Sequence, residues 1–174
     1  MELPKVEIKK ILYATDLSVH AREAFAYAVS MANKFNASIS ILHTVIDVPN
    51  FNTYIHGYID KEKWDAIKEQ QVQDAKDILI DKKKDIKLIK DALNAFCEDA
   101  KARYETTPFD MNEIIVNRGN PVDEIIKQSE NTNCDLIIMG SHGHGKLADA
   151  LVGSTAMRVV RRSKIPVLLV RLPE

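Results

Sequence analysis

Residues 134–155, CDLIIMGSHGHGKLADALVGST, decide how this sequence is interpreted. The stretch opens with Cys134–Met139, a strand with almost no polar–apolar alternation, which is typical of a sheet buried on both faces. A glycine cluster follows at Gly140–Gly145, and Gly153 then precedes a helix expected at Ser154–Ser163. A buried strand, a glycine-rich turn and a helix start, in that order, indicate a parallel α/β sheet.

Four further apolar runs extend this pattern along the chain. The expected strands are Lys9–Asp16, Ser38–Ile46, Glu113–Asn117 and Pro166–Val170. One helix is expected at 19–35, where apolar residues recur at helical spacing after Ser18 as a cap, and another opens with Pro121 in its first turn. The pattern predicts an α/β fold: a doubly wound five-stranded parallel sheet with helices on both faces.

The middle of the chain has a different character. Residues 61–104 contain no glycine or proline, and their apolar residues fall close to a seven-residue repeat interrupted by the charged run Asp81–Asp85. We expect one domain spanning residues 1–174, with a helical insertion at about 50–108 between the second and third strands. A single helix would extend over about 60 Å. We therefore favour a hairpin turning near Asp81–Asp85, and a continuous helix crossing to a second subunit is the alternative.

The ligand site of such a sheet can be located from its topology. Ligands bind beyond the carboxyl ends of the strands where the winding direction reverses, which predicts that the loops after Asp16 and Met139 lie together. Glycines admit close backbone approach, and the free N–H groups of a helix start favour phosphate. Neither a P-loop nor a dinucleotide fingerprint is present. A tight strand–helix turn without a ligand is the alternative for the glycine cluster.

Composition excludes several classes of function. The chain has 174 residues, 45% of them hydrophobic and 28% charged, and a formal net charge of −1. This near-neutral balance gives no sign of the phosphate attraction of a nucleic-acid binder. No apolar run approaches the roughly 18–20 residues of a membrane span, and no export signal is visible. We expect a cytoplasmic protein whose cysteines, Cys97 and Cys134, are reduced and lack metal-ligand spacing.

At this point the sequence closely resembles the universal stress protein family, in particular its ATP-binding branch. That branch carries a glycine, two residues, a glycine, nine residues, and a glycine followed by serine or threonine. These positions are filled here by Gly140, Gly143, Gly153 and Ser154. The resemblance covers most of the chain outside 50–108, including the stretches Ile11–Ser18, Ile41–His43, Asp135–Gly143 and Pro166–Val170.

The resemblance implies an ATP site, with Mg²⁺ or Mn²⁺ carried by the phosphates. Asp16 would contact the adenosine end, the backbone of Thr44 would meet adenine, and Met139 would line the base. Ala14 departs from the pattern, since some ATP-binding members have proline there. The full set of nucleotide-binding residues comprises Ala14, Thr15, Asp16, Thr44, Met139, Gly140, Gly143, His144, Gly145, Gly153, Ser154 and Thr155.

The function implied is that of an ATP-binding regulatory stress-response protein, a nucleotide-dependent binding module with an unidentified protein partner. The family also implies a homodimer through Val167–Val170. The alternative is a slow ATPase or other nucleotide hydrolase. No general base or dedicated carboxylate pair is evident, so no catalytic residue and no metal ligand is assigned. A structural protein that has lost its nucleotide is a third reading, against which the intact spacing Gly140–Ser154 argues.

Several polar residues admit simpler interpretations. Asp16 can cap the first helix together with Ser18, a role compatible with ligand binding. His43 is expected to be a core histidine, and His142 and His144 to lie beside the phosphates or in solvent. The basic residues near the C-terminus would form a solvated helix face or approach the phosphates; they are Arg158, Arg161, Arg162 and Lys164.

Overall fold

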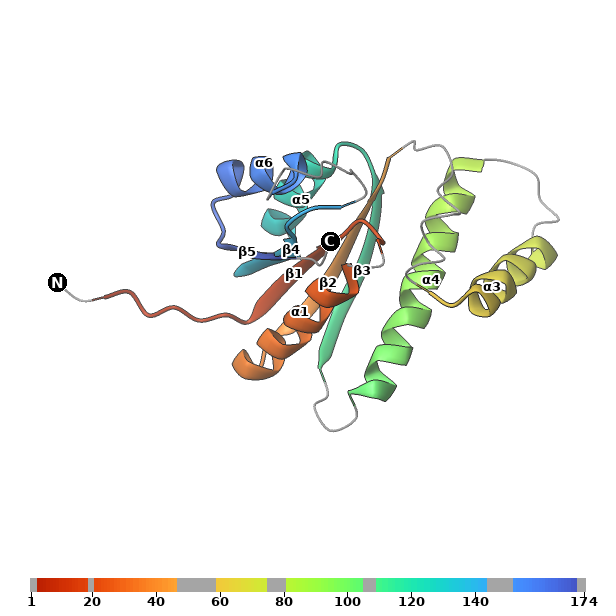
Figure 1. The fold of residues 1–174 in the computed structure, drawn as a ribbon, viewed down its shortest axis with the longest axis horizontal. Helices are drawn as coiled ribbons and strands as arrows, with labels where there is room; N and C mark the ends of the chain where they lie inside the picture. The colour runs from red at the N-terminus through yellow and green to blue at the C-terminus, as the bar shows by residue number, and fades with distance from the viewer. Residues whose placement is uncertain are drawn as a thin grey trace.

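The computed structural model describes residues 3–18, 21–46, 59–74, 81–104, 109–143 and 152–171. Its five strands are β1 (Lys10–Thr15), β2 (Ser38–Val45), β3 (Asp110–Arg118), β4 (Leu136–Gly140) and β5 (Val167–Val170). All pair in parallel, in the order β3-β2-β1-β4-β5 (Figure 1). The chain winds outward from β1 to β3, then returns to β4 and winds the other way. The predicted doubly wound parallel sheet is confirmed, with its reversal between β1 and β4.

Helices cover both faces of this sheet (Figure 1). They are α1 (Ala21–Phe35), α3 (Lys61–Asp74), α4 (Asp81–Arg103), α5 (Pro121–Asn131) and α6 (Ser154–Arg162). Alternate β1 residues belong to two separate cores: Ile11 and Tyr13 pack with α1 and α4, whereas Leu12 and Ala14 pack with α5 and α6. Since successive strand side chains point to opposite faces, both faces must be apolar, which explains the unbroken hydrophobic runs.

Capping residues begin the helices that flank the site. The backbone N–H of Ala21 donates to the Ser18 hydroxyl at 3.2 Å, as the sequence predicted. Asn120 does the same for α5, where its side chain accepts from the N–H groups of Val122 and Asp123. The Tyr13 hydroxyl donates to the Ala21 carbonyl at 2.7 Å. The two bonds to Ala21 fix the point at which the chain leaves β1 and enters α1.

The insertion folds back on itself as two helices. α4 packs against β3, and α3 packs on α4 (Figure 1). Trp64 of α3 is fully buried, and Lys63 forms an ion pair with Asp99 of α4. The hairpin is therefore confirmed. Asp81–Asp85 begin α4, so the two helices part just before the charged run near which the turn was expected. Lysine favours helix and aspartate favours a first turn, so a charged run need not interrupt a helix. The chain between the two helices lies outside the described residues.

Within the described ranges, no helix combines the length and the apolar character that crossing a bilayer requires.

Candidate functional site

The ends of β1 and β4 lie side by side at the reversal of the sheet. Ala14 pairs with Met139 in the parallel register, so Thr15 ends β1 beside Gly140 and Asp16 leaves the sheet there. Thr15 pairs with His43 of β2, which places Thr44 one residue farther along the same edge. The prediction that the loops after Asp16 and Met139 come together is confirmed.

The β1 loop is shaped by its own side chains. The Thr15 hydroxyl accepts from the Leu17 N–H at 3.0 Å, and the Asp16 carboxylate accepts through Oδ1 from the Ser18 N–H at 3.0 Å. Leu17 takes a φ of 64°, the left-handed conformation that such a tight turn requires. The chain therefore turns sharply toward α1, and the half-buried Asp16 carboxylate stays at the sheet edge.

His43 supports this loop from the neighbouring strand. Its side chain is 5% exposed, so the expected core position is confirmed. Its Nδ1 lies 2.9 Å from the Thr15 carbonyl oxygen. Because a carbonyl oxygen only accepts, Nδ1 carries the proton and donates. His43 was not among the predicted site residues, yet it fixes the end of β1 beside Asp16.

Asp16 and Gly143 are in direct contact across the two loops. A Cβ added to Gly143 would lie 2.2 Å from Oδ2 of Asp16 and 3.2 Å from its Cγ. The φ of Gly143 lies outside the left-handed range, so a backbone restriction is not the reason for glycine here. Gly143 instead leaves the space that the Asp16 carboxylate occupies. This explanation differs from the expected one, which was close approach of the glycine backbone to a phosphate.

Ser141 ties the start of α6 to the end of the sheet. Its N–H donates to the Val170 carbonyl of β5 at 2.7 Å, and its carbonyl accepts from the Gly153 N–H at 2.7 Å. A Cβ on Gly153 would lie 3.3 Å from Cα of His142 and 3.4 Å from the Ser141 carbonyl oxygen. Ser141 is buried and was missed by the sequence reasoning, although its place inside the glycine cluster was a usable signal.

α6 begins beside Ser141 at this edge, and its N-cap residue forms no side-chain cap. Gly153 is the N-cap residue and has no side chain with which to accept a hydrogen bond. Ser154 is exposed and Thr155 half-buried in the first turn. Uncapped N–H groups and the positive end of the helix dipole favour an anion at this position.

Most of the predicted site residues therefore gather at one edge. The described ones are Ala14, Thr15, Asp16, Thr44, Met139, Gly140, Gly143, Gly153, Ser154 and Thr155. His144 and Gly145 lie outside the described residues. Nδ1 of His142 lies 3.0 Å from the Ser141 hydroxyl. Among the described residues, no group of three or more histidine, cysteine, aspartate or glutamate side chains could hold a metal ion.

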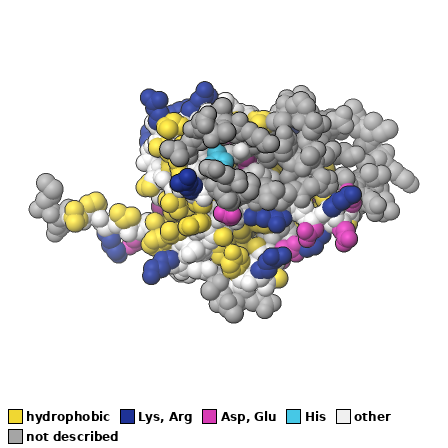
Figure 2. Space-filling model, viewed as in Figure 1, with side chains coloured by type: hydrophobic (Ala, Val, Ile, Leu, Met, Phe, Trp, Pro, Cys, Tyr) yellow, Lys and Arg dark blue, Asp and Glu magenta, His cyan; other side chains and the backbone are white. Residues whose placement is uncertain are grey.

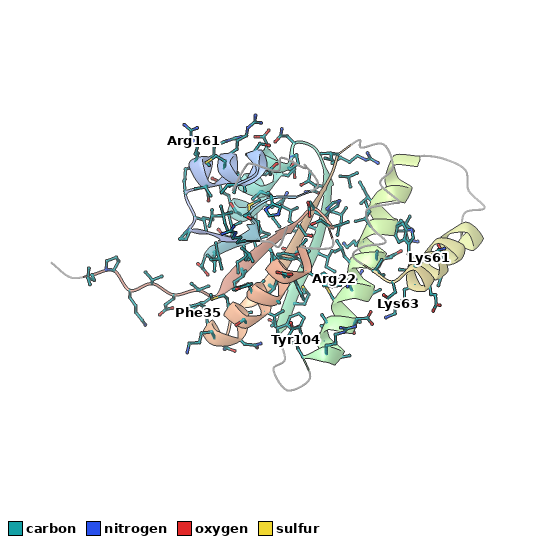
Figure 3. All side chains as sticks on the ribbon, in the orientation of Figure 1. Arg22, Phe35, Lys61, Lys63, Tyr104 and Arg161 are labelled. Carbon is teal, nitrogen blue, oxygen red and sulfur yellow. The ribbon has the colours of Figure 1, made fainter. Side chains whose placement is uncertain are left out.

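The basic residues of α6 turn away from the sheet. Arg162 pairs with Asp123 of α5 at 2.7 Å, and Lys164 lies 3.7 Å from Glu130. Arg161 points outward (Figure 3), and Lys and Arg side chains gather over this end of the molecule (Figure 2). These contacts support the interpretation of a solvated helix face.

Neither cysteine has nucleophilic character. Both are free and buried. Burial raises the pKa of the Cys97 thiol to about 12 and that of the Cys134 thiol to about 11. Both thiols therefore stay protonated at neutral pH, and neither is a reactive thiolate.

Comparison with known proteins identifies the family of this chain and several similar proteins. The model of the universal stress protein family matches residues 7–171. Universal stress protein MJ0577 of Methanocaldococcus jannaschii is 31% identical over 170 residues, which cover 95% of this chain and 96% of the relative. The solved structure of MJ0577 aligns with a TM-score of 0.59 at 28% identity and covers 97% of this chain and 99% of its own.

Two further solved structures share the fold. Universal stress protein UspA from Lactobacillus plantarum aligns with a TM-score of 0.61 at 21% identity, over 96% of this chain and 100% of its own. A universal stress protein in complex with cAMP aligns with a TM-score of 0.57 at 21% identity, over 95% and 98%. At this level of identity the likeness concerns the fold alone.

Proposed function

Because this chain belongs to the universal stress protein family, we propose that it is a regulatory stress-response protein that binds an adenine nucleotide, ATP above all, at the β1–β4 edge. The observation that carries the proposal is the meeting of the Asp16 carboxylate, the Gly140–Gly143 turn and the uncapped start of α6 at one point. A solved family member holds cAMP, which supports the adenine nucleotides as the ligand class.

The two halves of this edge suit the two ends of a nucleotide. The carboxylate of Asp16 only accepts hydrogen bonds, which fits the hydroxyls of a ribose. The N–H groups of Ser154 and Thr155 donate, and together with the helix dipole they fit phosphates. Thr44 and Met139 lie at the edge near Asp16, where they would meet the adenine ring. His144 and Gly145 are proposed to complete the phosphate turn.

A binding module fits this edge better than a hydrolase. The Asp16 carboxylate already accepts from the Ser18 N–H and lies against Gly143, so it is held as a positioning group. Mg²⁺ or Mn²⁺ would enter with the phosphates. Slow hydrolysis of ATP is the second candidate, because a nucleotide held beside a metal ion and water can react without a dedicated base.

We also propose a homodimer formed through β5. This strand ends the sheet, with β4 as its neighbour on one side and its other edge free to pair in the described chain. α6 packs beside it and exposes two apolar side chains, Met157 at 46% and Val160 at 44%. An open strand edge next to exposed apolar surface is normally paired or covered. Partner proteins would then bind this dimer, and their binding would depend on whether the nucleotide is present.

Identification of the bound nucleotide tests the proposal. The protein would be purified without added nucleotide, denatured, and its released small molecules measured by mass spectrometry. We expect ATP or another adenine nucleotide at a substantial fraction of one molecule per chain. Protein that releases no nucleotide, and that also gives no saturable heat when titrated with ATP, AMP or cAMP, would contradict the proposed function.

A further inference from the structure

Asn117 of β3 lies at the same edge of the sheet as the proposed nucleotide site. It pairs with Thr44 of β2 in the parallel register. On the other side of β2, Thr15 pairs with His43, so Asp16 follows at the level of Thr44. Neighbouring strands lie about 4.8 Å apart, which places Asn117 about 10 Å from Asp16. Asn117 therefore lies beyond the position proposed for adenine, on the side away from the ribose.

Thr44 and Asn117 belong to the face of the sheet that α5 and α6 cover. Two residues earlier in the same strands, Leu42 and Ile115 pack in the core on that face. Because side chains alternate along a strand, Thr44 and Asn117 return to it. α6 begins on this face as well (Figure 1). A nucleotide whose phosphates lie at the start of α6 can therefore extend its base across Thr44 toward Asn117.

Glu124 of α5 fixes which way the Asn117 amide faces. Nδ2 of Asn117 donates to Oε2 of Glu124 at 2.9 Å, and Nε2 of Gln128 donates to the same oxygen at 3.3 Å. Burial alone would raise the pKa of the Glu124 carboxyl, but these hydrogen bonds and the charge of Lys127 hold it below its ordinary value. The carboxylate is therefore ionised at neutral pH and only accepts hydrogen bonds. The amide must turn its nitrogen toward Glu124 and its oxygen away.

The residues around Glu124 hold this arrangement in place. Gln128 is buried, and its Oε1 accepts from Asn131 at 3.3 Å, which directs its own amide nitrogen toward Glu124. Gly119 takes a φ of 151°, and a Cβ there would lie 3.4 Å from Cγ of Glu124. Among the described residues, none donates a hydrogen bond to Oδ1 of Asn117. Oδ1 is therefore an oriented acceptor that a ligand can use.

We propose that Asn117 selects adenine over 6-oxopurines by accepting a hydrogen bond from the exocyclic amino group, with Glu124 as the positioning residue. The inference rests on the proposed function, because it assigns a residue to the base of the same ligand. Adenine carries an N–H donor on C6, whereas guanine and hypoxanthine carry a carbonyl oxygen there. A fixed amide oxygen pairs with the amino group and repels the carbonyl, since two acceptors form no hydrogen bond.

Calorimetric titration of the full chain with ATP and with ITP tests this selection. The two nucleotides share the ribose and the phosphates and differ at the C6–N1 edge of the base. We expect ATP to bind at least about tenfold more tightly than ITP. Asn117→Ala should bring the two affinities within about twofold of each other, because the oriented acceptor is gone.

Glu124→Gln tests the positioning role separately. A neutral side-chain amide can donate or accept, so the Asn117 amide can take either orientation beside it. The preference for ATP should therefore fall at least about threefold. A merely structural role of Glu124 would weaken the binding of both nucleotides equally and leave their ratio unchanged.

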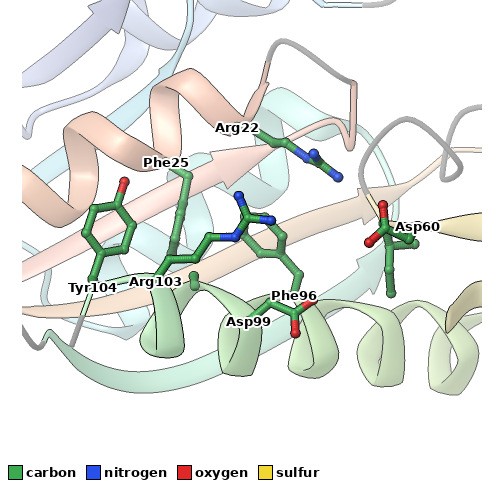
Figure 4. A pocket seen from close by; sticks show the side chains of 9 residues that line it. Arg22, Phe25, Asp60, Phe96, Asp99, Arg103 and Tyr104 are labelled. Atoms are coloured by element: carbon green, nitrogen blue, oxygen red, sulfur yellow. The ribbon is translucent and has the colours of Figure 1, made fainter.

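Two control variants should keep the ATP preference within about twofold. Asn112→Ala removes the asparagine at the opposite end of β3, whose amide donates to the Ser40 hydroxyl at 3.1 Å. Arg103→Gln changes the hollow between α1 and α4, which lies on the other face of the sheet and is lined by neither Thr44 nor Asn117 (Figure 4). Circular dichroism should show an unchanged fold in all four variants.

The outcomes separate this inference from the proposed function. Equal affinity of the unaltered chain for ATP and ITP, or an ATP preference that survives Asn117→Ala or Glu124→Gln, would overturn the inference while ATP binding still supports the function. A preference lost equally in Asn112→Ala or Arg103→Gln would also overturn it. Absence of binding by both nucleotides would overturn the inference and the proposed function together.

Discussion

Replacing Gly143 with alanine perturbs the contact between the two loops of the nucleotide edge. The added Cβ would lie 2.2 Å from Oδ2 of Asp16, whereas carbon and oxygen atoms in ordinary contact lie about 3.5 Å apart. The carboxylate must therefore move by more than about 1 Å. It is the end of a side chain rather than backbone, so it can swing away without rebuilding the sheet.

That movement breaks the hydrogen bond between Asp16 and the Ser18 N–H. Oδ1 of Asp16 accepts from the Ser18 N–H at 3.0 Å, and a displaced carboxylate gives this bond up. A bond to a charged group contributes about 1.5–3 kcal/mol, and water replaces part of it because Asp16 is half-buried. We expect the free energy of unfolding to fall by about 1–2 kcal/mol. ATP affinity should fall at least about tenfold, since Asp16 leaves the edge.

A double-mutant cycle isolates the contact. In an Asp16→Ala background the nearest remaining atom is Cβ of Asp16, 3.8 Å from the added methyl group, so Gly143→Ala should cost almost nothing. Urea unfolding followed by circular dichroism gives the stabilities, and calorimetry gives the ATP affinities. Gly153→Ala is the matched control, because its closest neighbour is 3.3 Å away and a small shift suffices. Equal losses of stability on Gly143→Ala in both backgrounds would show that the contact with Asp16 is not the cause.

Further predictions follow from the same structure. Valine at Gly143 or Gly153 should abolish ATP binding in calorimetry with an unchanged circular dichroism spectrum, and unaltered affinity in both variants would contradict the site. Leu169→Lys should weaken the dimer without removing nucleotide binding, whereas a monomer at tens of micromolar in light scattering of the unaltered chain would exclude the β5 interface. Steady phosphate release should stay far below about 10 per second, the median for enzymes, and turnover at that rate would favour the hydrolase. Burial in the folded state raises the pKa of the Cys97 thiol to about 12 and that of the Cys134 thiol to about 11, from 9.0 in the unfolded chain. Above pH 9 the folded state therefore binds more protons than the unfolded state, so the free energy of unfolding should fall as the pH rises. A urea midpoint that does not change with pH would contradict this prediction.

The local sequence pattern was sufficient to predict the fold because the three central strands, β1, β2 and β4, are buried on both faces. The run Leu136–Met139 has no polar interruption, and only a parallel sheet covered by helices hides such a run completely. Ser18 and Pro121 marked helix starts for reasons that operate within one turn, and the structure places both as expected. The reversal at β1 and β4 followed from the connection rules of such sheets.

Contacts between segments that are distant along the chain could not be predicted from the sequence. The closeness of Asp16 to Gly143 depends on where two loops end in space, so both residues could be predicted but the reason for glycine could not. The bond from His43 to the Thr15 carbonyl depends likewise on the register of β1 and β2. The turn of the hairpin could be predicted only approximately, because a run of lysines and aspartates fits a helix start as well as a turn.

We propose that an adenine nucleotide lies at the β1–β4 edge, between Asp16 and the start of α6. Backbone amide shifts of the ¹⁵N-labelled protein, recorded during titration with ATP, test it residue by residue. We expect saturable changes that are largest at Thr15, Asp16, Thr44, Gly140, Gly143, Ser154 and Thr155. Saturable changes that leave these amides unmoved and cluster instead on α4, or no change at millimolar ATP, would contradict it.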